Sequence, residues 1–415
     1  MKSLKKVFNN PAIPTEYHTN FLHLYSDIGW FGVLSGSAVN FINVYATRIG
    51  ATGFQIGLLG ATSAIVSLIF AIPAGRWLEQ RARGRAVFWS SAIYRIGFLT
   101  YVFIPWLFNA QGQIWAFILI GLLMGVPLVA LSVGFSALFA ESVPNEWRAH
   151  VAGTRNMVLS ITFMFTSLVS GYLLNHIAFP ANYQIIFLIG FVGAGLSSYH
   201  LYFIKPTFTA PPEAGAIDHP ATRAKTNWLT SIRADVWATP FRATLLVMLA
   251  FHIAQYLALP VFPLFFVHKL NLTDQNLGIG TALFYLTVLL GSIQLNQLVR
   301  RFGHKNVTAW GVIGMALYPG LLAISSQDWH YYGVSVLGGL AWALVGGASA
   351  NYVIENCPEN DRPAHLAWYN IILNASVLIG SLLGPAIADT IGLPMALLFF
   401  GLLRIIAGIV ILRWG

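Results

Sequence analysis

The chain has too few charged residues to form a water-exposed surface. Only 9% of its 415 residues are Asp, Glu, Lys or Arg, whereas soluble domains carry about 25%. Hydrophobic residues make up 57% of the sequence, and the mean hydropathy is +0.68. Lipid must therefore be the lateral solvent, and a lipid-exposed chain satisfies its backbone hydrogen bonds by forming helices. The sequence predicts an all-α polytopic membrane protein.

Cysteine and the common catalytic motifs are also scarce. The single cysteine, Cys357, excludes an internal disulfide framework and any cysteine-rich metal site. The chain has no Gly-x-x-x-x-Gly-Lys-Ser/Thr motif, no His-x-x-x-His pair on one helix and no Gly-x-Ser-x-Gly nucleophile elbow. We therefore expect no metal, no cofactor and no ATP-driven engine within this chain, and we do not expect an enzyme.

Long apolar runs alternate with short polar loops along the whole sequence. A spanning helix needs about 20 apolar residues, and lysine and arginine of short loops stay in the cytoplasm. The basic residues gather after the even-numbered runs, so both termini are expected in the cytoplasm and the protein in the cell membrane. This topology explains the formal net charge of +9 without a nucleic-acid partner. The twelve expected spans are roughly 20–47, 53–76, 86–108, 113–140, 151–177, 184–204, 241–267, 277–299, 307–326, 331–354, 366–388 and 394–413.

A charged hairpin, Gly75–Arg85, separates the second and third runs, and five of its eleven residues are charged. A weaker copy follows the eighth run, where Arg300 and Gly303 match Arg81 and Gly84 at an offset of 219. The two copies indicate an internal duplication.

A second repeat follows the fourth and tenth runs. Glu141 and Arg148 match Glu355 and Arg362, both at an offset of 214, within Glu-x-x-Pro-x-x-x-Arg. The long polar segment between the sixth and seventh runs is rich in proline and charge, and it divides the duplicated halves. The predicted organisation is a cytoplasmic N-terminus at 1–19, a six-helix bundle at 20–205, a cytoplasmic linker at 206–240 and a second six-helix bundle at 241–415.

Two parallel sets of six spans, a central linker and a basic glycine-ended hairpin resemble the major facilitator superfamily. This resemblance implies two pseudo-symmetric bundles that rock about a central site. The hairpin resembles the loop signature of that superfamily, with Glu79 where an aspartate is usual. Arg76, Arg81 and Arg85 could pair with Glu141 or Glu79. Such salt bridges at the cytoplasmic mouth would hold one conformation and break in the other; alternatively, the arginines only set topology and contact anionic lipid. The expected gate residues are Gly75, Arg76, Glu79, Arg81, Gly84, Arg85, Glu141, Arg148, Glu355 and Arg362.

Four charged residues lie at least about one turn inside expected spans: Asp27, Arg95, Arg155 and Arg404. Charges in lipid are costly and usually functional. A carboxylate in low dielectric can load and unload a proton near neutral pH, so Asp27 is the candidate for proton coupling. The alternative is that Asp27 is a structural partner of Arg95 or Arg155. The role of Arg404 stays open.

Polar residues also follow single helix faces. Gly32, Gly36, Asn40 and Asn43 form one stripe of the first span, suited either to helix packing or to lining a cavity. In the seventh span a histidine, an amide and a phenol share a face just before a proline. The candidate substrate-cavity residues are Asn40, Asn43, Arg95, Arg155, His252, Gln255, Tyr256, Asn370 and Asn374.

These features together predict secondary active transport of a small organic solute by alternating access, as proton-coupled export. An amphipathic or apolar solute is favoured, because most of the candidate cavity residues are neutral. An importer or facilitator of an anionic metabolite is the alternative, with Arg95 or Arg155 as its clamp. A non-transporting receptor usually needs an added soluble domain, for which no loop is long enough. The expected partners are a small-molecule substrate, protons and the lipid bilayer, and the expected state is a monomer.

Overall fold

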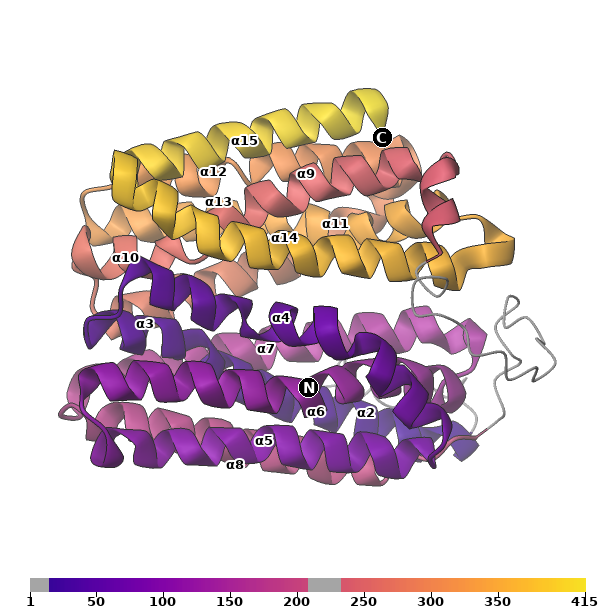
Figure 1. Ribbon diagram of the computed structural model, residues 1–415, viewed down its shortest axis with the longest axis horizontal. Coiled ribbons are helices and arrows are strands. Elements are labelled where there is room, and N and C mark those ends of the chain that lie inside the picture. Colours follow the sequence, from indigo (N-terminus) through magenta and orange to yellow (C-terminus); the bar gives the residue numbers. More distant parts are fainter. Residues whose placement is uncertain (1–14, 208–232) are drawn as a thin grey trace. The chain divides into compact units, whose positions relative to one another are not determined.

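The computed structural model describes residues 15–207 and 233–415, so the expected N-terminal segment and central linker lie largely outside the described part. Within those two ranges the regular elements are all helices, as predicted (Figure 1). The main helices are α2 (Thr15–Leu34), η1 (Ser35–Val39), α3 (Asn40–Arg48), α4 (Gly53–Glu79), α5 (Arg83–Leu107), α6 (Ala110–Ser142), α7 (Asn145–His176), α8 (Ala181–Tyr202), α9 (Arg242–Ala258), α10 (Val261–His268), α11 (Asp274–Gly314), α12 (Leu317–Ala323), α13 (Asp328–Glu355), α14 (Arg362–Ile391) and α15 (Leu393–Trp414). Two short 3₁₀ turns, η3 (Ala234–Ala238) and η4 (Glu359–Asp361), precede α9 and α14.

The helices account for the twelve expected spans. In the described residues, 10 helical segments are long and apolar enough to cross a membrane. One of these segments, Asp274–Ala323, has 50 residues, about twice the length that one span needs. Gly303 interrupts it at φ 78°, a backbone conformation that favours glycine. The first span is divided among α2, η1 and α3 and is not among those 10 segments, so it and the second half of Asp274–Ala323 complete the twelve.

The first compact unit contains Met1–Thr209 together with Pro263–Leu289. Within this unit α2 packs against α7 and α8, α5 packs against α6 and α8, and α4 packs against α6. Phe21, Leu24 and Val87 belong to its buried apolar core and are each at most 2% exposed. Because lipid is as apolar as these side chains, close packing and hydrogen bonds between helices stabilise the unit more than the hydrophobic effect does.

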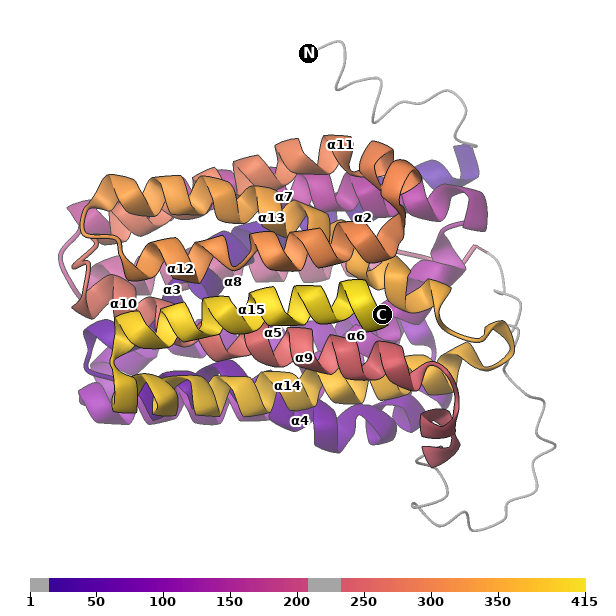
Figure 2. The same ribbon diagram turned by 90° about the horizontal axis from the view of Figure 1, so that it is seen from above.

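The second compact unit contains Ala210–Phe262 together with Leu290–Gly415. Here α9 packs against α14 and α15, and α12 packs against α13 and α15, as Figure 2 shows for the neighbouring helices α9, α14 and α15. The boundary between the units falls inside α11. Residues 263–289, which we expected in the C-terminal bundle 241–415, therefore cluster with the first unit in this conformation.

Side-chain oxygens cap the first turns of α4 and α11. The Thr52 hydroxyl accepts a hydrogen bond from the Gln55 backbone N–H at 3.2 Å, and Gln55 Oε1 accepts one from the Thr52 N–H at 2.9 Å. At the start of α11, the Thr273 hydroxyl accepts from the Asn276 N–H at 3.1 Å. A side-chain oxygen at this position satisfies a backbone donor that the first helical turn leaves open.

Candidate functional site

Asp27 lies at the centre of a buried ion-pair network in the first unit. Asp27 is 4% exposed, and its Oδ2 accepts hydrogen bonds from Arg155 Nη1 and Nη2, both at 3.2 Å. Its Oδ1 accepts from the Ser197 hydroxyl at 2.5 Å, and Arg95 Nη2 lies 3.9 Å from the same oxygen. The structure thus brings together three charged residues from α2, α5 and α7. One carboxylate faces two guanidinium groups, so the network has one excess positive charge.

The two arginines are held by backbone carbonyls as well as by Asp27. Arg155 Nη1 donates to Leu24 O at 2.6 Å, and Arg95 Nη1 donates to Ala194 O at 3.1 Å. Arg95 Nε is buried and has no hydrogen-bond partner in the described part of the chain. Both arginines lie in the interior of the first unit, and neither lines the cavity between α3, α4, α5 and α6. Removing Asp27 would leave two buried cations without a counter-ion, which is strongly destabilising.

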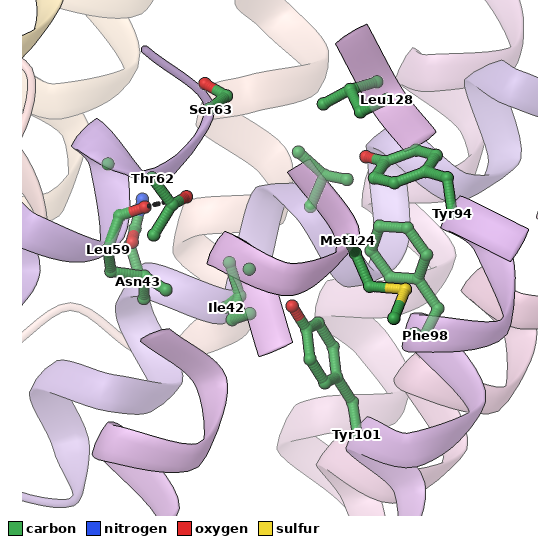
Figure 3. Close-up of a pocket in the computed structure, with 14 residues that line it drawn as sticks. Ile42, Asn43, Leu59, Thr62, Ser63, Tyr94, Phe98, Tyr101, Met124 and Leu128 are labelled. Carbon is green, nitrogen blue, oxygen red and sulfur yellow. Dashed lines mark hydrogen bonds between the residues drawn. The ribbon is translucent and has the colours of Figure 1, made fainter. Parts of the chain in front are cut away.

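The cavity has a volume of about 280 Å³ and is lined by α3, α4, α5, α6 and the last residue of η1. Figure 3 shows Tyr94, Phe98 and Met124 on one side of it, with Asn43 and Thr62 on the opposite side. No lining residue is charged. The complete lining comprises Val39, Ile42, Asn43, Leu59, Gly60, Thr62, Ser63, Tyr94, Gly97, Phe98, Tyr101, Gly121, Met124 and Leu128.

The polar stripe expected along the first span is divided between two surfaces. A Cβ added to Gly36 would lie 2.7 Å from Phe163 O on α7, so this glycine allows close packing of two helices. Asn43 instead lines the cavity on the side of α4, α5 and α6. The π-helical segment η1 contains Gly36 and ends before Asn43, and it adds one residue to the helical turn, which rotates all later side chains by about 100°. A regular 3.6-residue period cannot reveal this shift. Asn40 does not line the cavity.

In the second unit, His252 forms a pair that the sequence did not reveal. His252 is 8% exposed, and its Nε2 lies 3.0 Å from the Tyr369 hydroxyl of α14. Gln255 is also buried, and its Oε1 has no partner among the described residues. The Tyr256 ring lies 6.3 Å from the His252 ring, centroid to centroid. Single-helix faces identified three of these residues, but Tyr369 comes from another helix and required the fold.

The two asparagines expected to share a face of the eleventh span bond to their own helix. Asn370 Nδ2 donates to Leu366 O at 3.0 Å, and Asn374 Nδ2 donates to Asn370 O at 2.8 Å. Their carboxamide oxygens remain as candidates for ligand contact. Neither asparagine side chain shares a hydrogen bond with His252, whose ring contacts Tyr369 instead.

Arg404 has a structural explanation. It is 1% exposed, and its Nη1 donates to Met315 O at 2.8 Å while Nη2 donates to Gln255 O at 3.2 Å. Pro319 has no N–H and cannot donate to Met315 O, which lies four residues earlier. The guanidinium therefore replaces the hydrogen bond that this proline removes between α11 and α12.

A set of contacts joins the start of α11 to the rest of the first unit. Arg48 Nη2 lies 2.8 Å from Asp274 Oδ1 and also donates to Leu272 O at 2.8 Å. The Asn175 amide donates to Gln275 Oε1 at 3.2 Å. The sequence alone did not reveal this pair, because Arg48 and Asp274 are 226 positions apart.

Further along α11, two glycines allow close approach to α7. A Cβ added to Gly278 would lie 2.5 Å from Ser167 O, and one added to Gly171 would lie 2.8 Å from Asp274 O. Phe163 and Tyr285 stack with their ring centroids 4.0 Å apart. We refer to the contacts of Arg48, Ser167, Gly171 and Asn175 with residues 272–278 as the α11 clasp.

The expected partners of the loop acids need correction. In the first unit, Glu141 pairs with Arg83, which begins α5. Within the described chain, none of Arg76, Arg81 and Arg85 lies at salt-bridge distance from Glu141 or Glu79. The start of α5 directs Arg83 toward the end of α6, whereas the Arg81 guanidinium stacks over the Trp77 ring at 4.5 Å. The hairpin glycines, Gly75 and Gly84, lie within α4 and α5 and take no positive φ.

The remaining loop residues bond to other partners within their own unit. Arg148 donates to Ala140 O at 2.7 Å and to Val143 O at 3.1 Å, and so caps the end of α6. Glu355 lies 2.6 Å from His304 Nδ1, and Arg362 lies 3.5 Å from Glu359. The acid–base repeat is therefore kept in sequence, but its two acids have different partners in the two units.

Comparison with known proteins establishes the family. The family model described as "Major Facilitator Superfamily" matches residues 26–256 and 243–415. The chain belongs to the major facilitator superfamily, as its spans and hairpin suggested. It is a multi-pass membrane transporter of that family.

Sequence relatives are named as resistance proteins. The chain is 28% identical over 163 residues to "Tetracycline resistance protein, class B" of Escherichia coli. The aligned segment covers 38% of this chain and 39% of that protein, so the match spans well under half of either. It is 20% identical over 359 residues to "Quinolone resistance protein NorA" of Staphylococcus aureus (strain MRSA252), covering 86% of this chain and 85% of that one.

Solved structures show the same fold at low identity. A D-xylose-proton symporter superimposes with a TM-score of 0.73 at 15% identity and covers 95% of this chain and 97% of its own. The nucleoside transporter NupG (D323A mutant) gives a TM-score of 0.69 at 13% identity, covering 95% and 99%. At such identities the likeness establishes the fold alone.

Proposed function

We propose that this chain exports a small, uncharged and largely apolar organic solute by alternating access. The cavity of the first unit supports the proposal, because its lining is aromatic, aliphatic and uncharged. A charged solute entering it would lose its hydration and meet no counter-charge, which is unfavourable by several kcal/mol or more. The names of the relatives, which are resistance proteins for tetracycline and quinolone, favour export over import.

Proton coupling through Asp27 is the finer part of this proposal. Asp27 is the carboxylate that lies at salt-bridge distance from both Arg95 and Arg155. A proton on Asp27 would therefore remove the negative charge that these two guanidinium groups share. Asp27 would therefore accept a proton only in a conformation that gives the Arg155 guanidinium other acceptors. Such a linkage makes protonation and conformational change mutually dependent, which is what coupled transport needs.

The proposed orientation follows from the basic loops. Both termini and the Arg83–Glu141 pair lie on the cytoplasmic side of the cell membrane, and the α11 clasp lies at the outer ends of the helices of the first unit. The clasp would then hold the start of α11 against α7 in one state of the cycle and release it in the other. We propose a monomer as the functional state.

Uptake of an anionic metabolite is the second candidate. The excess positive charge of the Asp27, Arg95 and Arg155 network favours it, since an anion would supply the missing counter-charge.

The test uses the full chain in liposomes that contain a pH-sensitive dye. Gradients of apolar solutes should drive proton flux with the wild type and with the control Asp389→Asn, which changes an exposed carboxylate at the end of α14. Because Asp27→Asn also weakens the buried ion-pair network, its flux is measured below the temperature at which thermal unfolding in detergent shows that the variant begins to unfold, and there it should be abolished. Proton flux that persists unchanged in Asp27→Asn would remove the coupling claim. Flux driven only by anionic solutes would favour the second candidate.

A further inference from the structure

Two phenol hydroxyl groups point into the cavity of the first unit. Tyr94 and Tyr101 line the cavity from α5, and Figure 3 shows their hydroxyl groups directed away from that helix and into the space that Thr62 borders on the other side. Neither hydroxyl has a hydrogen-bond partner among the residues that the structure describes, and neither oxygen is shut off from the accessible surface. A molecule in the cavity can therefore reach both groups.

Neighbouring rings hold the two tyrosines in place. Tyr94 and Phe98 lie edge to face with ring centroids 5.5 Å apart, and Phe98 and Tyr101 do so at the same distance. The Tyr101 ring also lies edge to face against Phe117 at 4.9 Å and against Phe187 at 5.8 Å. These contacts fix the ring planes, and with them the directions of the hydroxyl groups, before a ligand arrives.

The two hydroxyl groups need hydrogen-bond acceptors once a ligand displaces water from the cavity. A phenol donates a hydrogen bond more readily than it accepts one, because its ring draws electron density from the oxygen. A hydrocarbon solute would leave both O–H groups unpaired in an apolar surrounding, which is unfavourable. A solute that carries a carbonyl oxygen supplies an acceptor and avoids this cost.

The dimensions of the cavity limit the solute further. Its volume of about 280 Å³ is at the lower end of the range for pockets that hold drug-sized molecules. Tyr94 and Tyr101 are seven residues apart, so they share one face of α5 and are separated by about 10 Å along its axis. A solute of one or two rings fits this space, and carbonyl oxygens at its two ends would meet both hydroxyl groups.

We propose that the cavity selects compact, uncharged ring compounds whose carbonyl oxygens accept hydrogen bonds from the Tyr94 and Tyr101 hydroxyl groups. This inference rests on the proposed function and specifies the substrate class for the same site. A site built to form a hydrogen bond rejects an analogue of the same shape that lacks the matching group. Tyr94 and Tyr101 are then the residues that distinguish a ketone from the corresponding hydrocarbon.

The probes are 1-indanone and indane, which have nearly the same shape and differ in one carbonyl group. Binding to the purified full chain is measured by calorimetry in detergent, with the heats of protein-free detergent subtracted. Tyr94→Phe/Tyr101→Phe keeps both rings and removes both hydroxyl groups, so it should weaken 1-indanone binding about tenfold and leave indane binding unchanged. Tyr199→Phe is the matched control, since Tyr199 is exposed on α8 and does not line the cavity, and it should bind both probes as the wild type does.

The outcomes separate this inference from the function on which it rests. Unchanged 1-indanone binding in the folded double variant would overturn the role of the hydroxyl groups, and so would an equal loss for both probes. If neither probe binds the wild type while the liposome assay reports export of other apolar solutes, the ligand class is wrong and the proposed function stands. Hydroxyl-dependent binding of 1-indanone without export of any solute would keep the site and overturn the proposed function.

Discussion

The guanidinium of Arg48 and the carboxylate of Asp274 lie 2.8 Å apart, although 226 residues separate them in the sequence. The Asp274 side chain is 10% exposed and that of Arg48 is 27% exposed, so the pair is partly shielded from solvent. Together with the bond from Arg48 to Leu272 O, it fixes the first turn of α11 to the end of α3. This attachment helps to explain why the first half of α11 clusters with the first unit.

Exchanging the two charges tests the strength of this pair. Asp274→Arg and Arg48→Asp each place two like charges together in a partly buried site, and each should destabilise the protein by about 2 kcal/mol. The double exchange should recover much of that loss, giving a coupling energy of about 1–3 kcal/mol. Thermal unfolding of the four proteins in detergent measures it. Additive effects of the two single variants would show that the pair contributes nothing.

Gly278 should tolerate no side chain. In Gly278→Ala the new Cβ would lie 2.5 Å from Ser167 O and 3.0 Å from Gly171 Cα, so α7 and α11 must separate. Overpacking of this kind costs about 1–3 kcal/mol. Gly195→Ala is the matched control, because nothing lies within 4 Å of its added Cβ, and alanine stabilises an open helical position by up to about 1 kcal/mol. Equal melting temperatures of the two variants would contradict the close contact.

Arg404 and Pro319 should be energetically coupled through one carbonyl oxygen. Arg404→Met leaves Met315 O without the guanidinium donor that lies at 2.8 Å, at a cost of about 1–3 kcal/mol. Pro319→Ala returns a backbone N–H that can bond to the same oxygen. The double variant should therefore be more stable than Arg404→Met alone, by about 1 kcal/mol. A double variant less stable than Arg404→Met would refute this explanation of Arg404. Unfolding in detergent provides the comparison.

Cys357 should react slowly with maleimides. It is 4% exposed, and burial raises the pKa of its thiol above the ordinary value. Only the thiolate reacts, so at neutral pH a smaller fraction is reactive than in an exposed cysteine, and the rate should rise steeply as the pH increases. A cysteine at the exposed position 359, introduced as Glu359→Cys with Cys357→Ser, should label at least about tenfold faster at pH 7. Similar rates at both positions would show that Cys357 is accessible.

The sequence predicted the spans and family well, but it predicted the partners of the charged residues only in part. Asp27 and Arg155 were considered as a pair because both are charges within lipid-spanning runs. The partner of Glu141 was wrong, since the turn that directs Arg83 toward α6 is set by the start of α5. Tyr369 and Asp274 were missed because each meets its partner across helices that are distant in the chain.

What the sequence by itself determined is the number of spans, the duplication and the family. These depend on hydrophobic length and on loop charge, which are local properties that lipid and topology impose directly on the chain. Only the tertiary structure decided which polar side chains meet. The π-helical segment Ser35–Val39 rotates Asn43 away from the glycine face and toward the cavity, and one extra residue in a helical turn leaves no mark on the hydrophobic pattern. The positions of Arg404 and of the α11 clasp likewise depend on helix packing, which brings together residues that no local period relates.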